Sequence, residues 1–236
     1  MTILITGASR GIGEALAYRL TSGGDTVILV ARNRGKLEKV AGECNNRAKH
    51  QVAYVIPFDL TDLQDLEKEF LSAVEGIANK LDALVNNAGQ LIRKPFSDTS
   101  MAEAKVLFDT NFFAPAQLTR LCLPLLRKSD QGQVVNITSM AGFQGSRKFA
   151  GLSYYSASKA ALGGLTEVLA EELKEEGVRV NSLALGAVQT EMYAESFPGM
   201  KVDMQPERMA EFISWFLREG GRFMNGKVIP VSSATP

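Results

Sequence analysis

The sequence has one histidine, two cysteines and no excess of charge of either sign. With only His50 available, a mechanism that needs two histidines is excluded, and we expect His50 to be a surface residue. Cys44 and Cys122 lie far apart without metal-ligand spacing, so we expect buried free thiols in a reducing compartment and no metal site. Lys plus Arg and Asp plus Glu number 26 each, which gives no electrostatic reason to bind nucleic acid.

The chain also lacks long hydrophobic runs. None approaches the roughly 20 apolar residues that are needed to cross a bilayer. Residues 1–6 form a short apolar stretch that leads into a glycine turn, and they have no basic leader with a long apolar segment behind it. We therefore expect no signal peptide, no membrane partner and a cytoplasmic protein.

Short runs rich in Val, Ile and Leu alternate with segments of helical periodicity along the whole chain. The apolar runs are continuous, which is typical of strands that are covered on both faces. This pattern predicts a Rossmann-type, doubly wound α/β fold with a mostly parallel sheet of about seven strands, helices on both faces, and one domain over residues 1–236. The predicted strands cover residues 3–6, 26–31, 51–58, 81–87, 133–138, 179–183 and 227–231, and the predicted helices include residues 13–22, 34–45, 63–79, 101–127 and 155–176.

A glycine-rich turn separates the first predicted strand from the first helix. Glycines allow a tight turn and a close approach of the backbone to a phosphate, and a helix N-terminus offers free N–H groups to an anion. A plain strand-to-helix turn is the alternative, but the position between strand and helix favours dinucleotide binding. The candidate cofactor-binding residues in this turn are Gly7, Ser9, Arg10, Gly11, Ile12 and Gly13.

The residues after the second predicted strand indicate which dinucleotide binds. NAD enzymes place an acidic residue there to bond the ribose hydroxyls. This chain has Arg32 and Asn33 instead, followed by Arg34. Arg32 could pair with a 2′-phosphate, assisted by Arg10, because a guanidinium matches phosphate geometry. The arginines could also be merely solvated. We predict NADP(H) as the cofactor, with NAD(H) as the alternative.

Two further strand ends carry candidate cofactor-binding residues. Asp59, followed by Leu60, could accept a hydrogen bond from the adenine amino group, or could cap a helix that starts near Asp62. The fourth strand closes with small and amide residues, which would suit a backbone that turns sharply beside a cofactor or a purely structural turn. These residues are Asn87, Ala88 and Gly89.

Tyr155 and Lys159 lie four positions apart in a predicted helix, so their side chains share one face. A phenol with an ordinary pKa of about 10 is a poor acid or base at neutral pH. A nearby ammonium favours the phenolate, so we expect Lys159 to lower the pKa of Tyr155. Two ordinary surface residues are the alternative for this pair taken alone.

Together these motifs resemble the classical short-chain dehydrogenase/reductase family over almost the whole chain. The pieces that match, in order, are Thr6 to Gly13, Asn86 to Gly89, Asn111, Ser139 and Tyr155-x-x-x-Lys159. The resemblance implies that Tyr155 is the general acid or base, that Lys159 binds the nicotinamide ribose and that Ser139 holds the substrate oxygen. It also implies that Asn111 holds a water linked to Lys159, and that Val188 and Thr190 contact the cofactor.

The resemblance implies an oxidoreductase that transfers hydride between NADP(H) and a carbonyl or secondary alcohol, with a 3-oxoacyl thioester as one candidate substrate. A NAD-preferring alcohol dehydrogenase and a non-catalytic nucleotide-binding regulator are the alternatives. Related proteins pair through two long helices, so a homodimer or homotetramer is expected. Three features depart from the family: a longer segment between Ser139 and Tyr155, Leu185 in place of a proline, and a short segment after Thr190.

Overall fold

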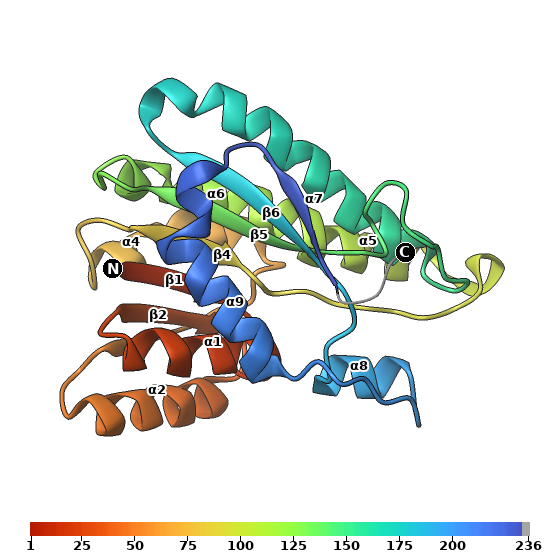
Figure 1. The fold of residues 1–236 in the computed structure, drawn as a ribbon, viewed down its shortest axis with the longest axis horizontal. Coiled ribbons are helices and arrows are strands. Elements are labelled where there is room, and N and C mark those ends of the chain that lie inside the picture. Colours follow the sequence, from red (N-terminus) through yellow and green to blue (C-terminus); the bar gives the residue numbers. More distant parts are fainter. Residues whose placement is uncertain (233–236) are drawn as a thin grey trace.

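A seven-stranded parallel sheet forms the centre of the structure, a computed structural model that describes residues 1–232 (Figure 1). The strand order is β3-β2-β1-β4-β5-β6-β7, which confirms the predicted α/β fold. The predicted domain over residues 1–236 includes residues 233–236, which lie outside the described part. The strands are β1 (Thr2–Thr6), β2 (Thr26–Ala31), β3 (Ala53–Pro57), β4 (Ala83–Asn86), β5 (Gln133–Ser139), β6 (Arg179–Leu185) and β7 (Val228–Val231).

The helices differ from the predicted ones mainly in where they are interrupted. Segments 63–79 and 101–127 each contain a π-helical turn, and α8 and α9 were not predicted. The helical elements are α1 (Gly11–Ser22), α2 (Arg34–Ala48), α3 (Leu63–Asp65), the π-turn η1 (Leu66–Phe70), α4 (Leu71–Glu75), η2 (Phe96–Asp98), α5 (Met101–Phe108), the π-turn η3 (Asp109–Phe113), α6 (Ala114–Leu126), α7 (Ser153–Glu172), η4 (Lys174–Glu176), α8 (Glu191–Ser196), α9 (Pro206–Arg218) and η5 (Gly220–Phe223).

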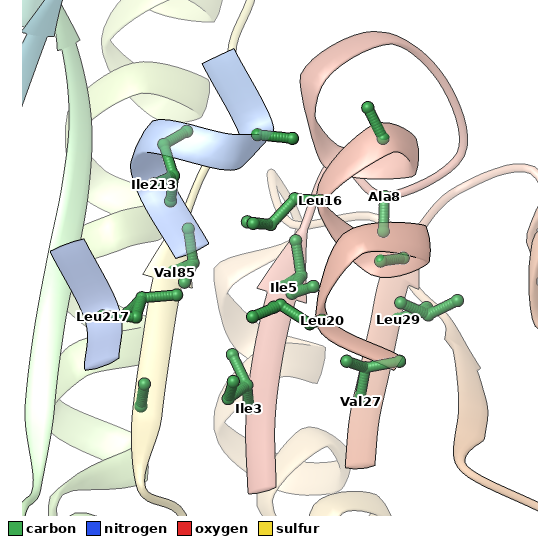
Figure 2. Packing of buried hydrophobic residues seen from close by; sticks show 14 of the residues in the cluster. Ile3, Ile5, Ala8, Leu16, Leu20, Val27, Leu29, Val85, Ile213 and Leu217 are labelled. Atoms are coloured by element: carbon green, nitrogen blue, oxygen red, sulfur yellow. The ribbon is translucent and has the colours of Figure 1, made fainter. Parts of the chain in front are cut away.

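Helices cover both faces of the sheet. On one face, α1, α2 and α9 pack over side chains of β1, β2 and β4. Figure 2 shows Leu16 and Leu20 of α1 and Ile213 and Leu217 of α9 gathered around Ile3 and Ile5 of β1. The other face is covered by α4, α6 and the C-terminal part of α7. Each fully buried Leu or Ile contributes about 1.5–3 kcal/mol, so both layers are strongly held to the sheet.

The predicted helix over residues 101–127 is broken at η3 for a local reason. Pro115 has no N–H and cannot bond to the carbonyl of Asn111 one turn earlier. The chain widens instead, and the Ala114 N–H bonds back to the Asp109 carbonyl, five residues away. Such π-turns often occur at functional sites.

The strands all run in the same direction, so their carboxyl ends lie along one edge of the sheet. The turns that follow β1, β4, β5 and β6 therefore come together there. In an open α/β sheet this carboxyl edge is where ligands bind. No helix within residues 1–232 is both long and apolar enough to cross a membrane.

Candidate active site

The glycine-rich turn after β1 has a shape that other residues would not tolerate. Gly7 and Gly11 have φ values of +67° and +58°, in the left-handed region that favours glycine. A methyl group on Gly13 would lie 2.4 Å from the Gly7 carbonyl oxygen. Arg10, the N-cap of α1, makes no side-chain cap, so the first N–H groups of this helix are available to an anion.

Side chains of β1 and β4 hold this turn in place. The Thr6 hydroxyl accepts hydrogen bonds from the backbone N–H groups of Asn87 at 3.0 Å and Ala88 at 2.9 Å. The Asn87 side-chain amide donates to the Thr6 carbonyl at 2.9 Å. The predicted residues Asn87 and Ala88 thus lie directly against the glycine-rich turn. The role of Thr6 as the link was not foreseen, although it directly precedes Gly7.

The basic residues near the turn differ in their contacts. Arg10 donates to Glu195 of α8 at 2.8 Å, an ion pair that the sequence did not predict. Arg32 is exposed just after β2 and makes no ion pair within residues 1–232. Asn33 caps α2 by accepting from the Lys36 N–H at 2.9 Å, so it has a structural role beside the predicted cofactor-binding one.

Asp59 and Leu60 follow β3, as predicted. Asp59 accepts from the backbone N–H of Thr61 at 3.0 Å and from its hydroxyl at 2.7 Å, whereas Asp62 caps α3. The helix-cap alternative for Asp59 is therefore wrong. The exposed Asp59 carboxylate borders a cavity of about 500 Å³ that α5 closes on the other side, while Leu60 is buried in the core.

Ser139 and Tyr155 meet at the carboxyl edge. Ser139 is the last residue of β5, and Tyr155 lies in the first turn of α7. Burial raises the pKa of Tyr155, and a hydrogen bond with Ser139 acts in the opposite direction. The net shift is upward, so the phenol keeps its proton at neutral pH. The predicted lowering of the Tyr155 pKa is wrong for the contacts seen here.

Lys159 lies one turn further along α7 and is 5% exposed. Its ammonium donates to the Ile137 carbonyl of β5 at 2.8 Å, which explains why it does not act directly on Tyr155. Burial lowers the pKa of Lys159 to about 8. A side chain on Gly89 would come within 3.3 Å of the Lys159 Nζ, so the predicted residue Gly89 leaves room beside this ammonium.

Asn111 is fully buried in η3, and its carboxamide joins three elements. Its Oδ1 accepts from the Gln90 N–H at 2.8 Å, and its Nδ2 donates to the Gln90 carbonyl at 2.9 Å. The same Nδ2 donates to the Ser158 hydroxyl at 3.0 Å, and Ser158 donates to the Tyr155 carbonyl at 2.8 Å. Asn111 is therefore joined to α7 through Ser158. The sequence did not predict this role of Ser158.

Val188 and Thr190 follow β6 and complete the edge. Val188 is buried in the core. The Thr190 hydroxyl accepts from the Tyr193 N–H at 3.2 Å and caps α8, and its methyl group lies near Gly11. Leu185, where the family has a proline, ends β6 and is 5% exposed. The substitution leaves the strand pairing intact, since Leu185 remains in register with Ser139.

A lysine holds the longer segment between Ser139 and Tyr155. The Lys148 ammonium donates to the carbonyls of Ala141 at 3.1 Å and Phe143 at 2.5 Å, and to the Ser146 hydroxyl at 2.9 Å. The sequence predicted a longer segment here but no residue that would hold it.

Aromatic and apolar side chains surround the entrance to this edge. Tyr154, the neighbour of Tyr155, stacks on Phe96 with ring centres 5.5 Å apart, and its hydroxyl lies 3.9 Å from the Met101 sulfur. Tyr154 therefore faces the entrance instead of Ser139. The Arg93 guanidinium lies over the Phe197 ring at 4.8 Å.

Comparison with known proteins agrees with this geometry. The profile of the short chain dehydrogenase family matches residues 1–201. An uncharacterized oxidoreductase of Staphylococcus epidermidis is 31% identical over 216 residues, which cover 92% of this chain and 90% of that protein.

Two crystal structures are also similar. A short chain dehydrogenase from Escherichia coli complexed with NADPH has a TM-score of 0.88 and 32% identity, covering 97% of this chain and 95% of that one. A 3-ketoacyl-(acyl-carrier-protein) reductase from Brucella melitensis complexed with NADH has a TM-score of 0.83 and 26% identity, covering 98% and 96%. On the family profile, the fold and the motif residues at one sheet edge, this chain belongs to the short-chain dehydrogenase family of oxidoreductases.

Proposed function

We propose that this protein is an NADP(H)-dependent reductase of ketones or aldehydes in which Tyr155 donates the proton. The observation that carries the proposal is the meeting of Ser139, Tyr155 and Lys159 at the sheet edge that also carries the glycine-rich turn. A 3-oxoacyl thioester is one candidate substrate. The NADPH complex of the similar E. coli protein supports the choice of cofactor.

The residues present fit a dinucleotide phosphate. The space that a side chain on Gly13 would fill, and the uncapped N-terminus of α1, suit a pyrophosphate. Arg32 is exposed and no acid follows β2, which suits a 2′-phosphate. Bound NADPH would supply the hydride. The NADH complex of the similar Brucella protein keeps NAD(H) as the alternative.

In this proposal the protein positions the carbonyl and supplies one proton. The Ser139 and Tyr155 hydroxyls lie close enough to hold one substrate oxygen between them. The raised pKa of Tyr155 keeps the phenol protonated at neutral pH, which suits a proton donor and therefore reduction. Lys159, charged below about pH 8, keeps a cation behind the tyrosine as the proton leaves. In the reverse reaction, the same residues would serve the oxidation of an alcohol.

Replacing Tyr155 with phenylalanine tests the proposal. Tyr155→Phe removes the proton donor and keeps the ring, so we expect the rate to fall by about 10²–10⁴-fold with little change in NADPH affinity. The assay follows loss of absorbance of the reduced nicotinamide with a panel of ketones and aldehydes.

Tyr154→Phe is the matched control. Tyr154 stacks on Phe96, so this variant should keep most of the activity of the parent protein. Near-parental turnover of Tyr155→Phe would refute the mechanism. Tight NADPH binding without turnover of any carbonyl would favour a nucleotide-binding regulator, and a higher kcat/KM with NADH would favour the NAD alternative.

We also propose a homodimer or homotetramer that forms through α5, α6 and α7. Val106 of α5, Phe113 of the adjoining η3 and Val168 of α7 are 40–55% exposed, whereas Leu162 of α7 is buried. A monomer seen by light scattering at micromolar concentration would contradict this assembly. The cytoplasmic location stays a prediction from the sequence.

A further inference from the structure

A hollow of about 340 Å³ lies at the amino edge of the sheet, opposite the catalytic side chains. It is formed where β4, β5 and β6 begin and where η5 leads into β7. Ser139 marks the other end of β5, so this hollow is separate from the candidate active site. The hollow is lined by the cationic residues Lys80, Arg179 and Arg222 and by the carboxylates Asp82 and Asp130.

Two of the cations have hydrogen-bond donors to spare. Arg179 is the first residue of β6, and its Nε is buried without a hydrogen-bond partner in the described part of the chain. One of its terminal nitrogens donates to the Gln131 carbonyl, at a long 3.4 Å. Burial and the nearby charge of Arg222 both lower the pKa of Arg179. A buried donor without a partner is costly, and two neighbouring guanidinium groups repel, so both features call for an anion.

The carboxylates of the hollow do not meet this need. Asp82 accepts from the Thr2 N–H at 2.7 Å and from the Ser129 hydroxyl at 2.5 Å, and within residues 1–232 it makes no ion pair with Arg179 or Arg222. The Lys80 Nζ lies 3.8 Å from Asp82, too far for a hydrogen bond. Asp130 is exposed and forms no ion pair with the three cations among residues 1–232.

Arg222 has only a loose partner of its own. Its guanidinium lies 3.8 Å from the Glu219 carboxylate, and both side chains are more than half exposed. An exposed pair at this distance contributes little to stability, so Arg222 can turn to another anion at small cost.

We propose that this hollow binds a phosphate group, held by Arg179 and Arg222 with Lys80 at its side. The planar guanidinium donors of two arginines match the oxygens of a phosphate, and such charge-assisted hydrogen bonds are the strong ones. The phosphate group can belong to free phosphate or to a small phosphate monoester. The hollow has room for the rest of a monoester, because it is larger than one phosphate needs. The site does not depend on the proposed catalytic activity.

Calorimetric titration of the whole protein tests the site, with inorganic phosphate and glycerol phosphate as probes and ionic strength held constant with sodium chloride. We expect saturable binding to the parent protein. Arg222→Gln should raise the dissociation constant about tenfold or more, and Lys80→Gln should raise it less. Both replaced residues lie at the surface, so these variants should fold. Tighter binding of glycerol phosphate than of phosphate would identify a monoester as the ligand.

Two control variants keep the outcome decisive. Arg208→Gln removes an exposed arginine of α9 that pairs with Glu211 outside the hollow, and it should bind phosphate like the parent. Arg32→Gln removes the proposed 2′-phosphate contact and should also leave this binding unchanged. The proposal is overturned if the parent shows no saturation, if Arg222→Gln binds like the parent, or if Arg32→Gln abolishes binding.

Discussion

Around the glycine-rich turn, part-buried hydrogen bonds pair side chains with backbone groups, whereas the surface beside Tyr154 consists of exposed side chains. The Thr6 hydroxyl accepts from the backbone N–H groups of Asn87 and Ala88, and the Asn87 side-chain amide donates to the Thr6 carbonyl, so side chain and backbone together join β1 to β4. Beside Tyr154, Phe96 is 67% exposed and Met101 is 72% exposed. The contacts at the turn need particular glycines, one hydroxyl and one amide, whereas an exposed side-chain surface can vary on the same fold. The fold therefore restricts which residues can form the glycine-rich turn, where we propose that the cofactor binds. It restricts the exposed residues beside Tyr154 much less.

Among the changes that compare these two regions, we expect the largest loss of stability and of NADPH binding from adding one methyl group to the glycine-rich turn. Gly13→Ala would put a methyl group 2.4 Å from the Gly7 carbonyl oxygen and 2.7 Å from the Asn87 amide. The Gly7 carbonyl belongs to the turn itself and the Asn87 amide is bonded to that turn, so neither can move without opening it. We expect the free energy of unfolding to fall by about 1–3 kcal/mol and NADPH binding to be lost. Chemical denaturation and calorimetric titration measure the two effects.

Gly164→Ala is the matched control for this substitution. Gly164 is exposed in α7, and no atom lies within 4 Å of the added carbon. Alanine should raise the free energy of unfolding by about 0.5–1 kcal/mol there. Equal stability and NADPH affinity in the two variants would show that the turn is less constrained than its contacts indicate.

Lys159 lies between the glycine-rich turn and the proposed substrate site. Its protonation state should therefore determine how the rate of reduction depends on pH. Burial lowers its pKa to about 8, so the ammonium is present below this value and lost above it. If the ammonium is needed, kcat/KM for reduction should stay level up to about pH 8 and then fall about tenfold per pH unit. Lys159→Arg, which stays charged, should remove this fall. A parent profile that is flat to pH 10 would contradict the role of Lys159.

Much of this structure could be predicted from local sequence, and the exceptions have physical causes. The strands and the glycine-rich turn depend on continuous apolar runs and on glycine spacing, which lie within a few residues of each other. Helix α9 was missed although its signals were present: Pro206 at its start, and Met209, Ile213 and Phe216 at helical spacing.

Other features could not be seen in the sequence. The direction of the Tyr155 pKa shift depends on burial and on Lys159 bonding to Ile137, and neither follows from a spacing of four residues. The Arg10–Glu195 pair joins residues that are far apart in the chain, and the charge of Arg222 acts on Arg179 although these two are also distant in sequence. Such pairs exist only once the sheet order has brought their loops together.

A smaller effect is expected from the loop beside the substrate. Lys148→Met removes three hydrogen bonds that hold residues 141–146, while keeping the length of the side chain. Because the loop follows Ser139 directly, we expect KM for the carbonyl substrate to rise about three- to tenfold with a smaller change in kcat. Arg147→Gln, on the exposed side of the same loop, is the control and should change neither constant. An unchanged KM in Lys148→Met would show that these bonds do not position the site.

The smallest effect concerns the Arg10–Glu195 ion pair, which joins the glycine-rich turn to α8. Glu195 binds Arg10 at 2.8 Å, and this contact lowers the pKa of Glu195. If Arg10 helps to bind a 2′-phosphate, the Glu195 carboxylate competes for the same guanidinium. Glu195→Gln should then tighten NADPH binding by about two- to fivefold and leave NADH binding unchanged, a small change because both partners are exposed. Calorimetric titrations at low and high salt measure it, since screening should reduce the difference. Glu207→Gln on α9 serves as the control for the loss of one negative charge, and an equal gain for NADH and NADPH would show that Arg10 does not contact the 2′-phosphate.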